Sequence, residues 1–528
     1  MAILNPDKLF PAWEDIPEEF RIEEISEGLN YLINGEILKT SLGIEVKSPI
    51  LIRDKDGIRP FKVGAYPDLD KEAALTALDA AEKAWASGMG EWPQMSVKER
   101  IACIEQFVWR IRPQEKIFAL LEMWEIARPY TACLDEFQRT LKYIEDTIRA
   151  LREMGKEARS IEQAGEYIYQ VRRYPLGVCL CMGPFNYPLN ETFAMLIPAL
   201  IMGNTVIVKL PKYGALCTVP LFTAFACSFP PGVVNIINGD GEKIITPIIE
   251  SGKVSVLGFI GSTRVANLLI SQHPANNRLR TILGLEAKNP AFVFPDADLK
   301  LTISECINGA LEFSGQRCTS LKHIWVHDSI VDQFLDGFSQ ALYKVVCGMP
   351  WEDKVMITPL PEEGKCQWLA QLVEDARQKG ARVVNRGGGE TYGNLFSPAL
   401  VFPVKQEMEL YQVEQFGPLI PVTPFSRMEE LFDYLSHTDY GQQASIFTSS
   451  ANYSVPLINV LVNQVCRINI NTQCRRSPDE LPFTGRKDSG EGTLSVSDAL
   501  RSFSIRSLIV ANEQGRDVFL SGLGRGKG

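Results

Sequence analysis

The sequence predicts an α/β protein built from two domains, each around a parallel sheet. From about residue 175 to 295, and again from about 290 to 477, short strand-like apolar runs alternate with helical segments. Helices of about 10–15 residues between strands are typical of βαβ units. A length of 528 residues accommodates several domains, and 45% hydrophobic with 22% charged residues excludes a disordered, collagen-like or coiled-coil chain.

The first alternation begins with an apolar strand. Pro188 stands at a good helix start and Gly203 at a helix end, so they bound the first helix. The Pro230-Pro231-Gly232 turn separates a later helix from the next strand. We therefore expect strands at 178–182, 205–210, 233–237 and 254–260, and helices at 188–202, about 216–228, 243–250 and from about 262 onward.

The second alternation predicts strands at 291–294 and 324–327, with helices extending to 313 and to about 347. Residues 72–160 are rich in helical patterns, which we expect to pack on the first sheet. Two segments with strand character, about 166–174 and 502–511, are predicted to pair as an arm, and the carboxyl-terminal SGLGRGKG is expected to be a loose tail.

Charge and targeting signals exclude several functions. With 54 Lys and Arg against 64 Asp and Glu, the net charge of −10 disfavours non-specific binding to nucleic acid or to an anionic membrane. An anionic substrate would therefore need a local basic pocket. Pro198 and Gly203 interrupt the longest apolar stretch, 193–208, so we expect no membrane span. The amino terminus has no apolar signal-peptide core, and we expect a cytoplasmic protein.

Metal and hydrolase chemistry are also disfavoured. The twelve cysteines are scattered without a CxxC pair, as expected for free thiols in a reducing compartment, and Cys179 and Cys181 lie in a buried strand pattern. His323 and His327 flank a strand-like Ile-Trp-Val, and neither HExxH nor GxSxG occurs. We predict no metal site. The Gly239-Asp-Gly241 segment lacks the third glycine of a dinucleotide-binding fingerprint.

The segment Ser314-Gly-Gln-Arg-Cys-Thr-Ser320 could carry chemistry. Gly315 permits a tight turn, and Arg317 is expected to lower the pKa of the neighbouring Cys318 thiol and hold it partly ionised. A thiolate is a far stronger nucleophile than a thiol. Taken alone, the segment also fits a buried structural cysteine, which is what a single cysteine in a cytosolic protein usually is.

Five further segments of the sequence favour the interpretation of Cys318 as a nucleophile. Their order and spacing along the chain matter more than each motif does alone: Phe185-Asn-Tyr-Pro188, Val208-Lys-Leu-Pro-Lys212, Phe259-Ile-Gly-Ser-Thr263, Glu414-Gln-Phe-Gly-Pro418 and Pro482-Phe-Thr-Gly-Arg-Lys-Asp-Ser-Gly490. Together with the Cys318 segment they resemble the aldehyde dehydrogenase superfamily from about residue 30 to 511.

The resemblance implies an aldehyde dehydrogenase-like domain organisation. It places an amino-terminal extension at 1–30, a Rossmann-type cofactor domain at 31–165 and 175–286, and a catalytic domain at 287–485. Residues 166–174 and 486–528 would form a small β oligomerisation arm and the carboxyl-terminal tail. A homodimer or homotetramer is implied.

The resemblance also implies a mechanism. Cys318 would attack the aldehyde carbonyl to give a thiohemiacetal, whose oxyanion the Asn186 amide and the Cys318 N–H would hold. Hydride transfer to a nicotinamide would leave a thioester, which water would release.

The same resemblance assigns cofactor contacts without a GxGxxG fingerprint. Lys209 would bind the adenosine ribose, and the pyrophosphate would lie near Gly261 and Ser262 at a helix start. Glu414 would fix the nicotinamide ribose beside Phe416. Many NAD-preferring relatives have a glutamate at the position of Lys212. Because a lysine can pair with a 2′-phosphate, we expect NADP, with NAD as the alternative.

Within the superfamily the chain most resembles the non-phosphorylating NADP-dependent glyceraldehyde-3-phosphate dehydrogenases. The positions that grip the substrate phosphate in that branch carry Arg139, Tyr187, Arg317 and Arg476 here. Three guanidiniums and a phenol converging on one point would hold a phosphate by charge-assisted hydrogen bonds. Glyceraldehyde 3-phosphate, or another small phosphorylated or anionic aldehyde, is the expected substrate.

One departure from the family pattern concerns the general base. The usual Leu-Glu-Leu-Gly-Gly-Lys reads Leu283-Gly-Leu-Glu-Ala-Lys288 here, so Gly284 replaces the glutamate and Glu286 stands two residues later. In a strand, two residues return a side chain to the same face about 7 Å further on. On that geometry Glu286 either reaches the thioester as a shifted base or does not.

Two alternatives therefore stay open. The first is a broad-range or coenzyme A-acylating aldehyde dehydrogenase, in which another thiol accepts the acyl group. The second is a non-catalytic scaffold that binds a dinucleotide.

Overall fold

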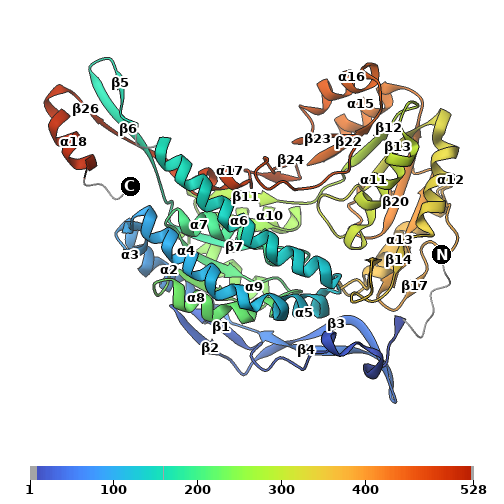
Figure 1. Ribbon diagram of the computed structural model, residues 1–528, viewed down its shortest axis with the longest axis horizontal. Coiled ribbons are helices and arrows are strands. Elements are labelled where there is room, and N and C mark those ends of the chain that lie inside the picture. Colours follow the sequence, from blue (N-terminus) through green and yellow to red (C-terminus); the bar gives the residue numbers. More distant parts are fainter. Residues whose placement is uncertain (1–8, 158–159, 525–528) are drawn as a thin grey trace.

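The computed structural model describes residues 9–157 and 160–524 and consists of two lobes with an arm projecting from the first (Figure 1). Each lobe is built around a largely parallel sheet covered by helices, which confirms the predicted α/β fold class. Within these described residues, no helix is both long and apolar enough to cross a membrane.

The sheet of the first lobe has eight strands. In spatial order they are β2 (Glu36–Lys39), β1 (Asn30–Ile33), β9 (Val234–Ile237), β8 (Thr205–Lys209), β7 (Val178–Met182), β10 (Val254–Ile260), β11 (Arg280–Gly284) and β25 (Gly490–Glu491). The five strands from β9 to β11 are mutually parallel, and β1, β2 and β25 add antiparallel edges. The predicted strands at 178–182, 205–210, 233–237 and 254–260 are therefore present.

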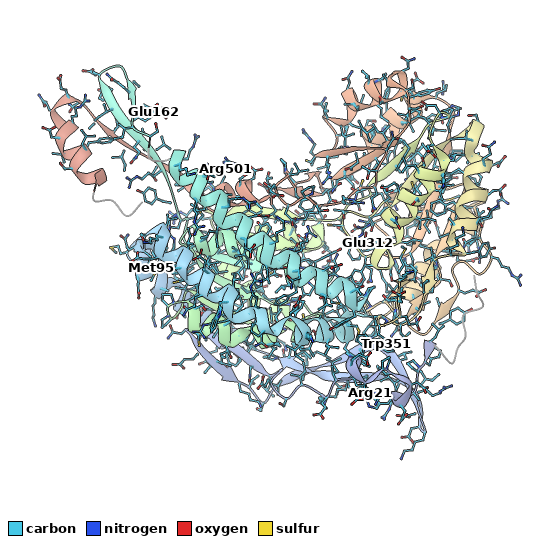
Figure 2. All side chains as sticks on the ribbon, in the orientation of Figure 1. Arg21, Met95, Glu162, Glu312, Trp351 and Arg501 are labelled. Carbon is cyan, nitrogen blue, oxygen red and sulfur yellow. The ribbon has the colours of Figure 1, made fainter. Side chains whose placement is uncertain are left out.

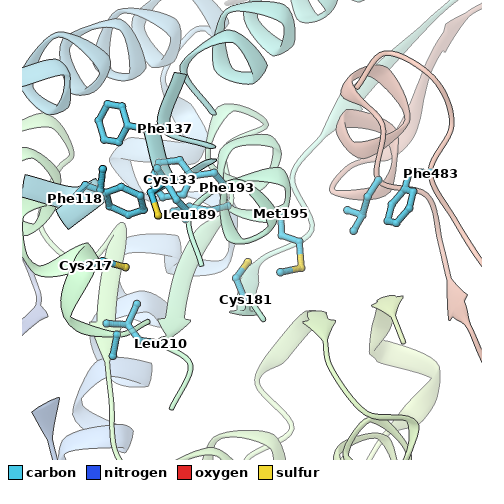
Figure 3. Packing of buried hydrophobic residues seen from close by; sticks show 14 of the residues in the cluster. Phe118, Cys133, Phe137, Cys181, Leu189, Phe193, Met195, Leu210, Cys217 and Phe483 are labelled. Atoms are coloured by element: carbon cyan, nitrogen blue, oxygen red, sulfur yellow. The ribbon is translucent and has the colours of Figure 1, made fainter. Parts of the chain in front are cut away.

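Alternation along β7 explains how both faces of this sheet are covered. Cys179 and Cys181 face one helical layer and Val178 and Leu180 the other, because successive side chains of a strand point to opposite faces. Figure 3 shows Cys181 beside Met195 in the first of these layers. That layer contains α4 (Val97–Ile111), α5 (Glu115–Ile126), α6 (Tyr130–Glu157), α7 (Asn190–Ile201) and α8 (Phe222–Ser228); the other contains α2 (Lys71–Trp85), α9 (Gly241–Glu250) and α10 (Thr263–Gln272).

The sheet of the second lobe has seven strands. Their order is β16 (Arg382–Val383), β19 (Ala399–Phe402), β20 (Leu419–Phe425), β13 (His323–His327), β12 (Pro290–Val293), β22 (Gln443–Phe447) and β23 (Arg467–Ile470). All are parallel except the edge strand β16. The helices of this lobe include α11 (Leu299–Leu311), α12 (Val331–Leu342), α13 (Lys365–Gln378), α15 (Met428–His437) and α16 (Ala451–Leu461).

The predicted arm strands do pair. The strand β26 (Ile505–Ala511) runs antiparallel to β6 (Tyr167–Tyr174), which also pairs with β5 (Glu162–Ala164). In Figure 2, Glu162 lies out on the arm and Arg501 near its base. A long hairpin of β3 (Gly43–Asp54) and β4 (Gly57–Pro67) runs along the opposite side of the molecule (Figure 1).

Three boundaries differ from the prediction. The helix expected to reach about residue 347 ends at Leu342, because the following Val346–Cys347 (β14) pairs with Val355–Ile357 (β15). The first half of the helix expected at 216–228 is a 3-10 helix over Leu216–Leu221, in which Pro220 supplies no N–H. Of the expected tail, residues 521–524 belong to α18 (Arg516–Gly524), and residues 525–528 lie outside the described residues.

Candidate active site between the two sheets

The site lies where the chain order of the first sheet reverses. The strands β8 and β9 lie on one side of β7, whereas β10 and β11 lie on the other. Open α/β sheets bind ligands at the carboxyl ends of strands at such a reversal. Asn186 and Tyr187 follow the carboxyl end of β7, and Gly261 and Ser262 follow that of β10.

The amino ends of the second sheet complete the site. Glu286 precedes β12, Cys318 precedes β13, and Glu414 and Phe416 precede β20. Residues from both lobes line one cavity of about 1130 Å³. It brings together all of the predicted site residues except Lys209: Cys318, Asn186, Glu286, Lys212, Gly261, Ser262, Glu414, Phe416, Arg139, Tyr187, Arg317 and Arg476.

The predicted tight turn before Cys318 is confirmed at Gly315, whose φ is 73°. A Cβ atom there would lie 2.6 Å from the carbonyl oxygen of Gly417 and 2.8 Å from that of Ala310. Only glycine allows the Cys318 loop and the Glu414–Pro418 loop to approach so closely.

The Cys318 thiol is half-buried and lines the cavity. Its pKa lies above the usual value, since burial disfavours the thiolate more than nearby Lys322 and Arg317 favour it. The charge of Arg317 thus acts on this pKa in the expected direction, but burial outweighs it, and the thiol is not held partly ionised. The Arg317 guanidinium instead pairs with Glu312 at 2.8 Å and donates to the carbonyls of Asn308 and Gly309 at 3.1 Å each. Glu312 lies between the two lobes (Figure 2).

Asn186 lies against the segment that carries Cys318. Its Nδ2 donates to the carbonyl oxygen of Gln316, two residues before Cys318, at 2.7 Å. A side-chain amide carries two N–H groups, so one donor remains for a second acceptor. The predicted oxyanion donor therefore stands next to the sulfur-bearing segment.

A buried ion cluster positions the loop that carries Asn186. Arg128 pairs with Glu122 at 2.9 Å and with Glu136, and its guanidinium lies 4.1 Å from the centre of the Tyr187 ring. Glu136 Oε1 accepts the N–H groups of residues 189 and 190 at 3.0 and 2.8 Å. A carboxylate and a guanidinium thus hold both ends of this short loop.

Glu414 is paired with a lysine that contacts the backbone of Cys318. Its Oε1 forms an ion pair with Lys322 and accepts the N–H of Ala287 at 3.2 Å. Lys322 also donates to the Cys318 carbonyl at 2.9 Å. Burial raises the pKa of Glu414, and the Lys322 ammonium opposes that rise. Phe416 makes an edge contact with Phe185 at a centroid distance of 5.9 Å.

The three arginines predicted to bind the substrate phosphate, Arg139, Arg317 and Arg476, each have a carboxylate partner. Arg139 makes a bidentate pair with Asp479 at 2.9 and 2.6 Å. Arg476 pairs with Glu191, and its Nε lies 3.5 Å from Asp479. Burial and the nearby Arg139 charge lower the pKa of Arg476 to about 10. The expected cluster of guanidiniums is present, but carboxylates offset its positive charge.

Comparison with known proteins decides the family. The aldehyde dehydrogenase family model matches residues 55–508, most of the chain.

The chain belongs to the aldehyde dehydrogenase family.

Relatives and solved structures agree with this assignment. The chain is 33% identical over 485 residues to the NADP-dependent glyceraldehyde-3-phosphate dehydrogenase of Streptococcus equinus, covering 90% of this chain and 96% of that protein. It is 30% identical to the Apium graveolens protein of the same name, covering 93% and 97%. A crystal structure of the Bacillus halodurans enzyme of that name, complexed with NADP, is 31% identical with a TM-score of 0.84, covering 92% and 99%.

In this aldehyde dehydrogenase, Glu286 is not where strand geometry would place it. The strand β11 ends at Gly284, so the two-residue repeat does not extend to residue 286. The Glu286 carboxylate instead accepts the N–H of Thr263, the first residue of α10, at 3.1 Å. Of the two possibilities left open for Glu286, the strand repeat therefore supports neither, and the carboxylate is held at the start of α10.

The cavity wall at α10 has the chemistry that a dinucleotide requires. Backbone N–H groups at the start of α10, the Lys212 ammonium and the Arg264 guanidinium would serve phosphates, and Val265 adds apolar surface. Lys209 ends β8, where burial lowers its pKa to about 8 and Asp240 opposes that shift. The residues present fit the group, apart from the Glu286 carboxylate at the same helix start.

Sequence reasoning missed several residues of the site, because their roles depend on distant partners. Lys322 could have been noticed four residues after Cys318, and Asp479 three residues after Arg476. Arg128 and Glu191 carry no local signal. As for metals, within residues 9–157 and 160–524 no cluster of three or more His, Cys, Asp or Glu could hold one. His323 is buried in β13, 2.7 Å from the hydroxyl of Thr423.

Proposed function

We propose that this aldehyde dehydrogenase oxidises glyceraldehyde 3-phosphate to 3-phosphoglycerate with NADP. The observation that carries the proposal is the single cavity in which the Cys318 thiol, the Asn186 amide and the arginines Arg139, Arg317 and Arg476 face the same space. The names of the relatives above support the substrate and the cofactor.

The chain's own residues would act as follows. The Cys318 sulfur gives up its proton to solvent and attacks the aldehyde carbon, and the carbonyl oxygen becomes an oxyanion. The free N–H of Asn186 donates to that oxyanion, as a donor already in place where charge develops. Lys209, Lys212, Ser262, Glu414 and Phe416 would hold the dinucleotide, which supplies the hydride acceptor when bound. The thiohemiacetal carbon gives up its hydrogen as a hydride to that acceptor, the C=O bond reforms, and a thioester remains on Cys318. Water then attacks the thioester carbon, and the acid leaves as the Cys318 thiol is restored.

The arginine cluster would orient the phosphate end of the substrate. Arg139 and Arg476 share the Asp479 carboxylate, so they lie close together on one wall. A dianionic phosphate competes with a carboxylate for a guanidinium through the same bidentate geometry.

A kinetic comparison tests the proposal. Reduction of NADP and NAD is followed with glyceraldehyde 3-phosphate and with glyceraldehyde, the unphosphorylated control. We expect kcat/KM with NADP to be higher for the phosphorylated aldehyde by about 100-fold, because charge-assisted hydrogen bonds contribute about 1.5–3 kcal/mol each. Equal values for the two aldehydes would refute the substrate assignment. Binding of NADP without turnover of any aldehyde would instead support a scaffold.

A second candidate function rests on Gly284. Residue 284 supplies no carboxylate, and Glu286 is engaged by Thr263, so water activation at the thioester lacks the family's usual base. The acyl group would then pass to the sulfur of coenzyme A, which gives its proton up as the Cys318 thiol reforms. A stoichiometric burst of NADPH, with turnover restored by coenzyme A, would favour this acylating reaction. Unchanged turnover on adding coenzyme A would favour hydrolysis.

The arm supports a homodimer or homotetramer. The strand β26 is an edge strand with exposed apolar side chains at Leu508 and Val510. Such an edge is a template for pairing with another chain. We expect light scattering to give two or four times the 59.0 kDa chain mass. A monomer at micromolar concentration would contradict this assembly.

A further inference from the structure

The carboxylate of Glu286 occupies one of the positions that a cofactor phosphate would take. Glu286 Oε2 accepts the Thr263 N–H at 3.1 Å, from the first residue of the ten-residue helix α10. The first N–H groups of a helix have no partner within the helix, and together with the helix dipole they favour an anion. Glu286 supplies that anion from within the chain.

Two further groups at this helix start are also engaged by the chain itself. The Ser262 hydroxyl accepts the Val265 N–H at 3.4 Å, and the Thr263 hydroxyl donates to the carbonyl of Asp488 at 3.2 Å. The Thr263 N–H is thus held by the one charged group among these contacts. Glu286 also lines the large cavity, so its carboxylate stands on the surface that a ligand would meet.

The charge of Glu286 also acts on two other residues that line the cavity. Burial is the main cause that raises the pKa of Glu414 and of Tyr440, and the Glu286 charge adds to both shifts; both residues line the same cavity. A dinucleotide whose pyrophosphate lies at α10 and whose nicotinamide ribose lies at Glu414 would therefore pass this carboxylate. Two anions cannot accept the same N–H, and like charges at close range repel each other.

We propose that Glu286 is a built-in competitor of the cofactor: its carboxylate caps α10 in the free protein and must leave Thr263 for the pyrophosphate to bind. This inference rests on the proposed function, because it takes NADP as the ligand and the start of α10 as its phosphate site. It makes Glu286 a determinant of cofactor affinity. The glutamate stands where the family pattern has glycine, so the competition is a property of this chain.

Two substitutions separate charge from size. Glu286→Gln keeps an oxygen that can accept the Thr263 N–H but removes the negative charge, and Glu286→Gly also removes the side chain. Glu312→Gln is the matched control, since it removes one negative charge from the same cavity, at a residue that pairs with Arg317, whereas Glu286 contacts α10. Unchanged thermal midpoints, measured first, establish that each variant is folded.

The readout is equilibrium binding by calorimetry, without substrate, using NADP and adenosine 2′-phosphate. The second probe has the adenine and the 2′-phosphate but lacks the pyrophosphate. We expect Glu286→Gln and Glu286→Gly to bind NADP about tenfold more tightly than the wild type, the scale of one helix-terminal anion interaction together with the relief of repulsion. Adenosine 2′-phosphate should bind all variants within twofold, as should NADP with Glu312→Gln.

Each other outcome has a distinct meaning. Equal or weaker NADP binding by both Glu286 variants overturns the inference. Equal tightening in Glu312→Gln, or equal tightening for adenosine 2′-phosphate, also overturns it, because the effect would then be the net charge of the cavity and not competition at α10. Failure of every protein, wild type included, to bind NADP refutes the proposed cofactor instead.

Discussion

The guanidinium of Arg476 forms a buried ion pair with the carboxylate of Glu191, 285 residues away in the chain. Glu191 lies in the first turn of α7, directly after the loop that carries Asn186 and Tyr187. The pair therefore links the loop of Asn186 and Tyr187 to the segment that carries Arg476. In the proposed function, a substrate phosphate would meet a guanidinium whose charge is already balanced by a carboxylate.

Removing the negative charge of Glu191 should strengthen the binding of anionic substrates. In Glu191→Gln the amide keeps the shape of the side chain but leaves Arg476 only the Asp479 carboxylate, which Arg139 shares. We therefore expect KM for glyceraldehyde 3-phosphate to fall about three- to tenfold. The KM for glyceraldehyde should stay within twofold. Steady-state kinetics on both aldehydes give the comparison, with Glu480→Gln, an exposed carboxylate outside the cavity, as the control. A fall of equal size for both aldehydes would contradict a phosphate-specific effect.

Removing the guanidinium of Arg476 should weaken the binding of phosphorylated substrates only. We expect Arg476→Leu to raise KM for glyceraldehyde 3-phosphate at least tenfold and to leave glyceraldehyde nearly unaffected. Because the substitution also leaves Glu191 buried without its partner, the midpoint of thermal unfolding should fall. Kinetics must therefore be measured well below that midpoint. Equal effects on both aldehydes would argue against a phosphate pocket.

The proposal that Cys318 is the nucleophile predicts that its replacement removes activity without weakening cofactor binding. Cys318→Ala should abolish aldehyde oxidation while NADP affinity stays within a few-fold, since the thiol is not among the proposed cofactor contacts. Cys227→Ala, at an exposed cysteine, is the matched control and should retain full activity. Retained turnover in Cys318→Ala would exclude this residue as the nucleophile.

The pH dependence of thiol reactivity follows from the position of Lys322. Burial raises the pKa of Cys318, so alkylation by iodoacetamide should still accelerate above pH 8.5, the ordinary range of a cysteine. Lys322→Met removes the main charge that favours the thiolate and should slow alkylation at pH 8 at least threefold. Peptide mass spectrometry resolves the rate at Cys318. A rate that levels off below pH 8 in the wild type would contradict the predicted direction.

A buried carboxyl in the helical layer should make stability depend on pH. Burial raises the pKa of Glu125 to about 7, although the N–H groups of Leu216 and Cys217 donate to its oxygens at 3.0 and 2.8 Å. The folded state thus binds a proton that the unfolded state, with an ordinary pKa near 4.5, has lost. Stability contributed by the protonated form is complete below about pH 4.5 and declines as pH rises toward 7, by about 3 kcal/mol in all.

Denaturant unfolding of Glu125→Gln at pH 5 and pH 7.5 tests this dependence. The amide cannot ionise, so the decline in unfolding free energy between the two pH values should be smaller than in the wild type. The test compares how much the unfolding free energy declines with pH in the two proteins, and not its absolute value. The Gln amide also places an N–H group against one of the two backbone N–H donors, Leu216 or Cys217. An unchanged decline would show that Glu125 is not responsible.

The fold follows from local patterns to a large extent. Short apolar runs such as 178–182 and 254–260 became strands at the predicted residues, because each is buried on both faces and needs no distant partner to be recognised. The helix after Asp328 was predicted too long, since its end depends on strand pairing between Val346–Cys347 and Val355–Ile357. The residues of one segment do not show which other segment it will pair with.

By itself, the sequence determined which residue types stand at the strand ends and in what order, and therefore the family, the cysteine and its neighbouring motifs. Only the tertiary structure decided how those groups are paired. Arg476 forms an ion pair with Glu191, Arg139 with Asp479, and Glu414 with Lys322. Glu286 accepts a backbone N–H at the start of α10. The physical reason is that charge compensation and burial depend on which segments pack together, and both decide how a site residue behaves.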